Sequence, residues 1–130
     1  MNTNREGRTE KRELEEVSGS DLLAQIESGT APAILDVRSR AEFRRGHVPG
    51  AVHVPFWTLR WRLHRVPASR ADSLVVYCGH GPRAWLAGGL LRRRGYSRVS
   101  YLSGHFSGWR AAGLREERQA MRGTGLVRPC

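Results

Sequence analysis

The central part of the chain alternates short apolar runs with segments of helical periodicity. The runs with the pattern of buried strands lie at residues 33–37, 51–54, 74–77 and 99–102. The segments with helical patterns or caps are 20–27, the stretch after Ser39, the stretch after Pro55, 82–94 and 105–112. Strands that alternate with helices are typical of a parallel sheet. The pattern therefore predicts an α/β fold with about five parallel strands flanked by helices on both faces.

Both ends of the chain lack this pattern. Residues 1–16 are mostly charged or polar, and residues 114–130 combine charged side chains with glycines. We expect a flexible N-terminal extension at 1–16, one domain at 17–113 and a C-terminal tail at 114–130. No apolar run approaches the length of a membrane span, and no signal peptide is visible. We therefore expect a cytoplasmic protein with no membrane partner.

Charge and cysteine content narrow the chemistry. The chain holds 22 basic and 12 acidic residues, a formal net charge of +10, and most of the excess lies in its second half. Such a surplus suits anionic ligands. Two cysteines cannot form a disulfide scaffold, and no compact zinc pattern exists among Cys78, His80, His47 and His53. We expect no metal and no cofactor.

Cys78 stands at the junction of the strongest strand pattern and the following helix. The backbone N–H groups of residues 79–83 can point inward there and form a cradle for an anion. The same field favours the thiolate over the thiol and so lowers the pKa of Cys78. A buried structural cysteine is the simpler interpretation, but a glycine-rich turn with Pro82 and Arg83 is more than such a residue needs. The residues expected to line the anion site are Gly79, His80, Gly81 and Pro82.

Three motifs carry a resemblance to a known family. They are Asp36-Val37-Arg38 with Glu42-Phe43 and Gly46-His47-Val48-Pro49-Gly50-Ala51; Cys78-x-x-Gly81-x-Arg83; and Leu102-Ser103-Gly104 with Gly108-Trp109. In this order and spacing they resemble the rhodanese-like sulfurtransferases over about residues 17–113, which implies the rhodanese-like α/β sandwich. His105 departs from the pattern, because a second glycine is common at that position.

The resemblance implies a two-step transfer of sulfane sulfur with Cys78 and Arg83 as catalytic residues. Cys78 would take sulfur from thiosulfate or a persulfide donor as a persulfide and pass it to a thiol, a protein sulfur acceptor or cyanide. Arg83 would attract or orient the anion. The loop also bears on the reaction, since sulfurtransferases of this fold carry four residues between cysteine and arginine and phosphatase relatives carry five. This chain has four.

Two alternative functions stay open from the sequence. One is a phosphatase or arsenate reductase of the same fold, which the loop length disfavours. The other is a sulfur-relay or docking module that recognises an acidic protein or a tRNA through the basic second half. No aromatic side chains interleave with those arginines in a nucleic-acid-binding pattern, so the sequence argues against nucleic acid.

The remaining candidates are expected to support the site or to pack. Asp36, Arg38, Glu42 and His47 are expected to be structural residues near the loop. Arg38 and Glu42 fit an ion pair beneath the loop better than substrate contacts, and His47 fits a hydrogen-bonded turn. His80 either assists the leaving group or points into solvent.

The aromatic residues and the last cysteine carry weaker expectations. Trp57 and Trp61 are spaced as one packed helix face, and Trp85 and Trp109 are expected in the core or at the rim of the site. Cys130 is either a resolving thiol on the tail or a residue without a role.

Overall fold

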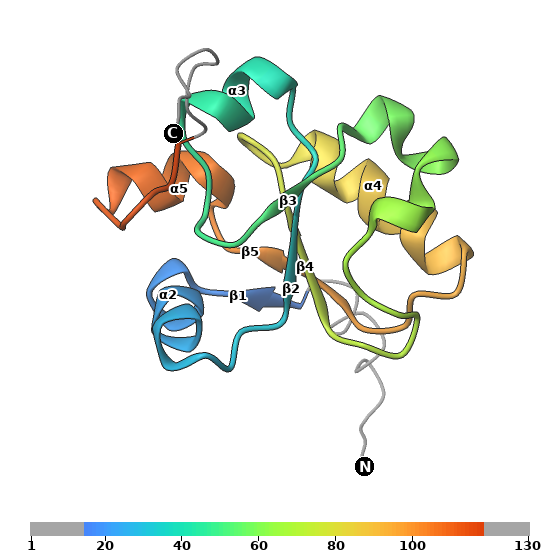
Figure 1. The fold of residues 1–130 in the computed structure, drawn as a ribbon, viewed down its shortest axis with the longest axis horizontal. Coiled ribbons are helices and arrows are strands. Elements are labelled where there is room, and N and C mark those ends of the chain that lie inside the picture. The colour runs from blue at the N-terminus through green and yellow to red at the C-terminus, as the bar shows by residue number, and fades with distance from the viewer. Residues whose placement is uncertain (1–14, 119–130) are drawn as a thin grey trace, which may run out of the picture.

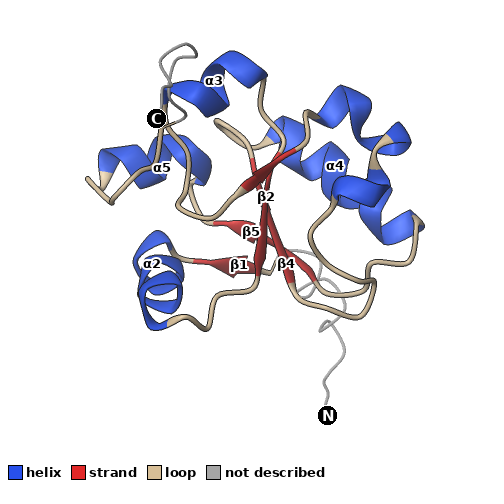
Figure 2. Ribbon diagram, in the orientation of Figure 1, coloured by secondary structure: helices blue, strands red, loops and turns tan. Residues whose placement is uncertain are grey.

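The computed structural model describes residues 15–118, which form one parallel sheet between two layers of helices (Figure 1 and Figure 2). The strands are β1 (Glu16–Val17), β2 (Ala33–Asp36), β3 (Val52–His53), β4 (Leu74–Tyr77) and β5 (Val99–Leu102). Their order is β1-β5-β4-β2-β3, and every neighbouring pair is parallel. β4 therefore lies in the middle, and the loop that follows it leaves the sheet at its centre.

The helices divide between the two faces of the sheet. They are α2 (Gly19–Ser28), α3 (Arg40–Arg45), α4 (Pro82–Arg93), α5 (His105–Ala111) and the 3-10 helices η1 (Phe56–Trp61) and η2 (Leu63–Arg65). In Figure 1, α2 and α5 lie to the left of the strands, and α4 lies to the right. α3 follows β2 closely, so it lies near the carboxyl ends of the strands.

Alternation along β2 and β4 builds a separate core on each face, because successive side chains of a strand point to opposite sides. On the side of α4 and η1, the core includes Leu35, Val76, Leu59 and Leu91. On the side of α2 and α5, it includes Ile34, Val75, Leu22, Phe106 and Trp109. Both central strands are thus buried on both faces, which explains why their sequence is apolar without a gap.

Short polar signals set the ends of the helices. Ser39 caps α3 in a capping box, in which its side chain accepts from the Glu42 N–H and the Glu42 carboxylate accepts from the Ser39 N–H. α2 ends at Gly29, which adopts a left-handed conformation with φ 79°. None of the helices among residues 15–118 combines the length and the apolar character needed to cross a membrane.

The predicted sheet is confirmed, and the differences are local. β4 and β5 have the predicted limits, and the parallel arrangement with helices on both faces is as expected. α2 is capped by Ser18, not Ser20, because the Ser18 side chain accepts from the Asp21 N–H at 3.1 Å. The segment after Pro55 forms a 3-10 helix in place of the expected amphipathic helix.

One expectation about burial is wrong. Trp57 and Trp61 do not form a packed face, since they are 51% and 68% exposed. A 3-10 helix has three residues per turn, so two residues four apart do not lie on the same face of η1. Leu59 fills its buried side instead. Of the other two tryptophans, Trp109 is buried in the core and Trp85 is exposed.

Ordered contacts extend past both expected domain limits. Glu16 pairs with Tyr101 at the edge of the sheet, as part of β1. After α5 the chain turns back, and Glu117 pairs with His47 in an antiparallel bridge. Backbone pairing of this kind does not depend on side-chain polarity, and the composition of these segments therefore gave no sign of it.

Adjacent glycines in α4 offer a test of how closely this helix packs on β5. A Cβ at Gly88 would lie 2.9 Å from Cζ and 3.0 Å from Cε1 of the buried Tyr101 ring, whereas a Cβ at Gly89 would meet only the end of Arg93 at 3.9 Å. We expect Gly88→Ala to lower the free energy of unfolding by about 1–3 kcal/mol through overpacking. Gly89→Ala should raise it by up to about 1 kcal/mol, because alanine is the better helix former. Urea unfolding of both variants measures the difference, and equal effects would contradict this packing.

Candidate active site

The loop from Cys78 to Arg83 joins the central strand to the start of α4. Tyr77 ends β4, and α4 begins at Pro82 with Gly81 as its N-terminal cap. Gly81 adopts φ 136°, a conformation that side-chain-bearing residues rarely take, so a glycine is needed for the chain to curl here. The loop thereby places backbone N–H groups around the sulfur of Cys78.

Cys78 is buried, and its sulfur accepts hydrogen bonds from the loop. The Gly81 N–H lies 2.9 Å from Sγ. Burial raises the pKa of the thiol, but hydrogen bonds from the His105 side chain and from the N–H groups of Ala84, Gly81 and His80 outweigh it and lower the pKa to about 7. The thiolate is therefore favoured near neutral pH, compared with an ordinary cysteine.

His105 is a member of the site whose contribution the sequence did not reveal. Its Nδ1 accepts from the Cys78 N–H at 3.3 Å, and its ring lies near Gly81. It has φ 54°, and no other non-glycine residue in the described part of the chain has a positive φ. In the sequence, His105 stood out only because a glycine is common at this position. That difference pointed to an unusual backbone conformation, but not to a contact with the thiol.

Arg83 and Glu42 form an ion pair beside the loop. The two guanidinium N–H groups donate to the two carboxylate oxygens at 2.7 and 3.1 Å. The hydrogen bonds from Arg83 lower the pKa of Glu42 to about 2, against a smaller opposite effect of burial. The same contacts raise the pKa of Arg83. The pair ties the start of α4 to α3.

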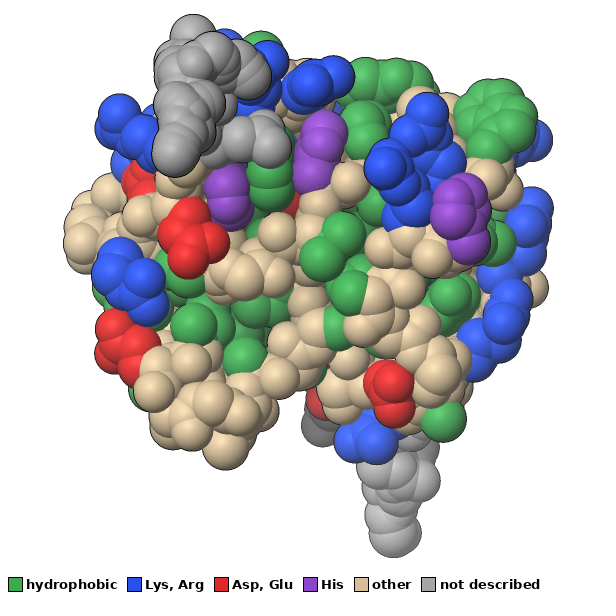
Figure 3. All heavy atoms as spheres, viewed as in Figure 1, with side chains coloured by type: hydrophobic (Ala, Val, Ile, Leu, Met, Phe, Trp, Pro, Cys, Tyr) green, Lys and Arg blue, Asp and Glu red, His purple; other side chains and the backbone are tan. Residues whose placement is uncertain are grey.

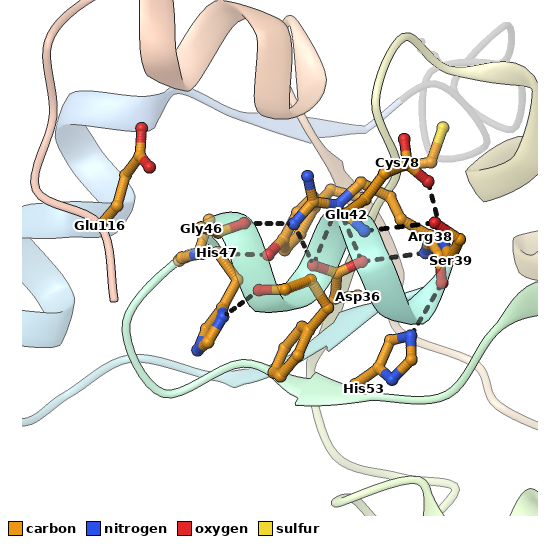
Figure 4. A network of polar contacts seen from close by, with 12 residues as sticks. Asp36, Arg38, Ser39, Glu42, Gly46, His47, His53, Cys78 and Glu116 are labelled. Carbon is orange, nitrogen blue, oxygen red and sulfur yellow. Dashed lines mark hydrogen bonds and ion pairs between the residues drawn. The ribbon is translucent and has the colours of Figure 1, made fainter. Parts of the chain in front are cut away.

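Asp36 and Arg38 form a second ion pair, which is buried at the end of β2 (Figure 4). Arg38 donates to both carboxylate oxygens at 2.8–3.1 Å, and its Nη2 also donates to the Gly46 carbonyl at 2.6 Å. Its guanidinium lies 4.2 Å from the centre of the Phe106 ring. Burial lowers the pKa of Arg38, but Asp36 more than offsets this and the net shift is upward.

The expected pairing between Arg38 and Glu42 is therefore wrong. Each has another partner: Asp36 for Arg38 and Arg83 for Glu42. Asp36 precedes Arg38 by only two residues in an extended segment, which places both side chains on the same side and favours a bidentate contact. All four residues were identified from the sequence, but the sequence did not show which carboxylate would pair with which guanidinium.

His47 lies in the turn that precedes β3. Its Nδ1 is 2.8 Å from the Phe43 carbonyl oxygen, and its ring stacks on the Phe43 ring with centroids 3.7 Å apart. Its Nε2 lies 3.8 Å from the Glu117 carboxylate. On the other side of Phe43, the His53 ring stacks at 4.7 Å. Both histidines thus brace α3 and lie outside the Cys78 loop.

A pocket of about 450 Å³ opens beside the loop. Its lining includes Gly79, His80, Arg45, Phe106, Ser107 and Arg110. Arg110 is held by Glu116 at 2.8 Å, and the exposed His80 is the titratable loop residue that reaches the pocket. An anion in this pocket would meet the loop on its open side.

The structure thus brings most of the predicted site residues together around one loop. Cys78, Gly79, His80, Gly81, Pro82 and Arg83 form the loop, and Glu42 contacts it through Arg83. Arg38 reaches the lining of the pocket beside the loop and binds the buried Asp36, whereas His47 packs against Phe43 of α3. Cys130 is outside the described residues.

Removing Asp36 tests the buried pair. Asp36→Ala leaves Arg38 charged and unpaired inside the protein, so we expect the free energy of unfolding to fall by about 3–5 kcal/mol. Glu27→Ala is the matched control, because Glu27 pairs with Arg115 on the surface at 3.6 Å and such pairs contribute about 1 kcal/mol or less. Urea unfolding gives both values. An equal loss in the two variants would contradict the central role of Asp36.

Replacing His105 tests its effect on the thiol. His105→Gly keeps a residue that tolerates the positive φ but removes the hydrogen bond to the thiolate, so the pKa of Cys78 should rise above about 7. A rise of one unit would reduce the thiolate at pH 7 to roughly a tenth of the protein. The rate of iodoacetamide alkylation against pH reports this pKa, and His80→Gly, which keeps the loop N–H group, serves as control. An unchanged pKa in His105→Gly would exclude the role.

Comparison with known proteins agrees with this geometry. The family model described as a rhodanese-like domain matches residues 18–112. A sulfurtransferase of Allochromatium vinosum is 32% identical over 101 residues, which cover 78% of this chain and 92% of that protein. The thiosulfate:glutathione sulfurtransferase of Homo sapiens is 31% identical over 105 residues, covering 72% and 90%. A crystal structure of the Alr3790 protein from Anabaena sp. superposes with a TM-score of 0.70 at 31% identity, covering 78% of this chain and 81% of that one.

The named relatives support a sulfurtransferase role, and the matching structure supports the fold. Since the family model spans nearly the whole described domain, the chain belongs to the rhodanese-like domain family.

Proposed function

We propose that this protein transfers sulfane sulfur from thiosulfate or a persulfide donor to a thiol or cyanide acceptor through a persulfide on Cys78. The observation that carries the proposal is the contact of the Gly81 N–H with the Cys78 sulfur at 2.9 Å, in a loop that lowers the pKa of the thiol to about 7. A nucleophile poised near neutral pH is what covalent transfer needs.

In the first step, the Cys78 thiolate attacks the outer sulfur of thiosulfate. A sulfur–sulfur bond forms to Cys78, the bond to the oxidised sulfur breaks, and sulfite leaves with the electron pair. The persulfide then carries its negative charge on the terminal sulfur. The N–H groups of His80, Gly81 and Ala84, which contact the Cys78 sulfur, would stabilise the charge.

In the second step, an acceptor thiolate attacks the terminal sulfur of the persulfide. A new persulfide forms on the acceptor, and Cys78 leaves as the thiolate that began the cycle. Cyanide reacts in the same way and gives thiocyanate. No oxidant or reductant is consumed, because the sulfane sulfur keeps its oxidation state in both steps.

The same loop disfavours phosphoryl or arsenyl chemistry. Only four residues separate Cys78 and Arg83, and the Cys78 side chain is buried among them. A ring of this size suits a single sulfur atom better than a tetrahedral group with its oxygens. The alternative of a phosphatase or arsenate reductase is therefore not favoured.

In the proposed reaction, Arg83 positions the loop, whereas the sequence had suggested that it orients the anion directly. Its Nη1 and Nη2 each donate to Glu42, so Arg83 fixes the loop and adds positive potential there. Arg45 and His80 line the pocket of about 450 Å³ and would receive the anionic donor and the acceptor. A relative that bears the name thiosulfate:glutathione sulfurtransferase supports a small anionic thiol as acceptor.

The reaction would take place in the domain of residues 17–113, in a reducing compartment such as the cytoplasm. A nucleophilic thiol and a persulfide both persist best where disulfides are not formed.

The direct test is the mass of the intact protein after brief incubation with thiosulfate. We expect a gain of one sulfur atom that disappears when a thiol is added. Cys78→Ser should show no gain, and the matched variant Cys130→Ser should gain sulfur as the unmodified protein does.

The pH dependence provides an internal check. Because the reactive form is the thiolate, the rate of sulfur uptake should rise with pH through a midpoint near the Cys78 pKa of about 7. Folded protein that gains no sulfur at any pH between 6 and 9 would overturn the thiosulfate reaction.

A further inference from the structure

A second pocket, of about 600 Å³, lies on the other side of α3 from the Cys78 loop. Its lining residues are Arg40, Phe43, Val52, His53, Pro55, Thr58, Arg62 and Arg65. They come from α3, β3 and the segment of η1 and η2, so three separate elements converge on it. None of the residues that line it is acidic.

The arginines of this pocket differ from those beside the loop. Arg38, Arg83 and Arg110 each have a carboxylate partner. For Arg40, Arg62 and Arg65, the structure shows no side-chain hydrogen bond or ion pair with any of residues 15–118. Three guanidinium groups around one cavity repel one another, and an anion bound between them removes that repulsion.

Figure 3 shows the face that carries this pocket. Its upper right part carries arginine, histidine and hydrophobic side chains, and the acidic side chains visible on this face lie to the left and near the bottom. Together with a lining that contains no acidic residue, this makes the pocket positively charged.

The rest of the lining is apolar or aromatic. Phe43, Val52 and Pro55 provide this surface, and the Phe43 ring is held rigidly between His47 and His53. A pocket that combines a few convergent polar groups with an apolar wall has the usual composition of a small-molecule site, and 600 Å³ is within the usual size.

We propose that this pocket binds a small organic polyphosphate. The phosphate groups would lie among Arg40, Arg62 and Arg65, whose planar forks match phosphate oxygens. The organic part would pack on Phe43, Val52 and Pro55. Three arginines correspond to the charge of about three on a diphosphate ester at neutral pH. The site is separate from the sulfur-transfer loop, and it would stand even if Cys78 accepted no sulfur.

Binding can be measured by calorimetry and by tryptophan fluorescence, because Trp57 and Trp61 of η1 directly precede the lining residues Thr58 and Arg62. The probes are ADP, pyrophosphate, adenosine and citrate at equal ionic strength. We expect ADP to bind most tightly, pyrophosphate more weakly and adenosine not at all. Citrate or pyrophosphate binding as tightly as ADP would overturn the assignment of an organic phosphate, and so would the absence of ADP binding at low salt.

Variants locate the site. The double variant Arg62→Gln/Arg65→Gln should weaken ADP binding by about tenfold or more, through loss of two charge-assisted contacts. Arg60→Gln is the control, since Arg60 lies in η1 just before Arg62 but stacks over Trp61 outside the lining. Equal weakening in both would show attraction by net charge alone and overturn the proposal.

Arg45→Gln separates the two pockets, because Arg45 lines only the pocket beside the loop. A loss of ADP binding in Arg45→Gln but not in Arg62→Gln/Arg65→Gln would place the anion at the Cys78 loop and overturn the proposal. Urea unfolding of Arg62→Gln/Arg65→Gln should follow that of the unmodified protein, which establishes that this variant is folded whether or not Cys78 accepts sulfur.

Discussion

The buried ion pair of Asp36 and Arg38 holds together the carboxyl ends of the central strands, from which the Cys78 loop leaves the sheet. Asp36 is the last residue of β2, and its carboxylate is wholly buried. Besides Arg38, it meets the hydroxyl of Tyr77, the residue just before Cys78. Arg38 extends the link to the Gly46 carbonyl and to Phe106 of α5. A buried carboxylate requires such partners, so a single charge requirement aligns segments that are far apart in sequence.

Tyr77 shows how this pair reaches the loop. Its hydroxyl accepts from the Val48 N–H at 3.0 Å, and burial together with Asp36 keeps its pKa well above the ordinary value. The last residue of β4 is therefore a neutral, doubly bonded anchor. α5 adds a second anchor, because the Phe106 N–H donates to the Cys78 carbonyl and the Ser107 N–H to the Gly79 carbonyl. The loop is fixed from both sides, which leaves its own N–H groups directed at the sulfur.

Much of the fold was predictable from the sequence, because apolar runs and turn residues are local signals. The strands at Leu74–Tyr77 and Val99–Leu102 and the loop after Cys78 follow from them. Of the site, only the part formed by one continuous segment, the loop from Cys78 to Arg83, was predictable from the sequence. The pairing of Glu42 with Arg83, the thiol contact of His105 and the bridge of Glu117 to His47 all join distant segments. Composition and periodicity carry no information on such contacts. Trp57 and Trp61 show a further limit, since their spacing fits an α-helix and the chain forms a 3-10 helix there.

At position 105, the backbone conformation favours glycine, whereas the lowered pKa of Cys78 depends on a histidine side chain. A left-handed conformation favours glycine, and a histidine held in it costs about 1 kcal/mol or more. The same side chain makes the thiol more reactive. Glycine at this position would thus give a more stable and more slowly reacting protein, and histidine gives a less stable and faster one. Selection for thermal endurance and selection for turnover would therefore favour different residues at position 105.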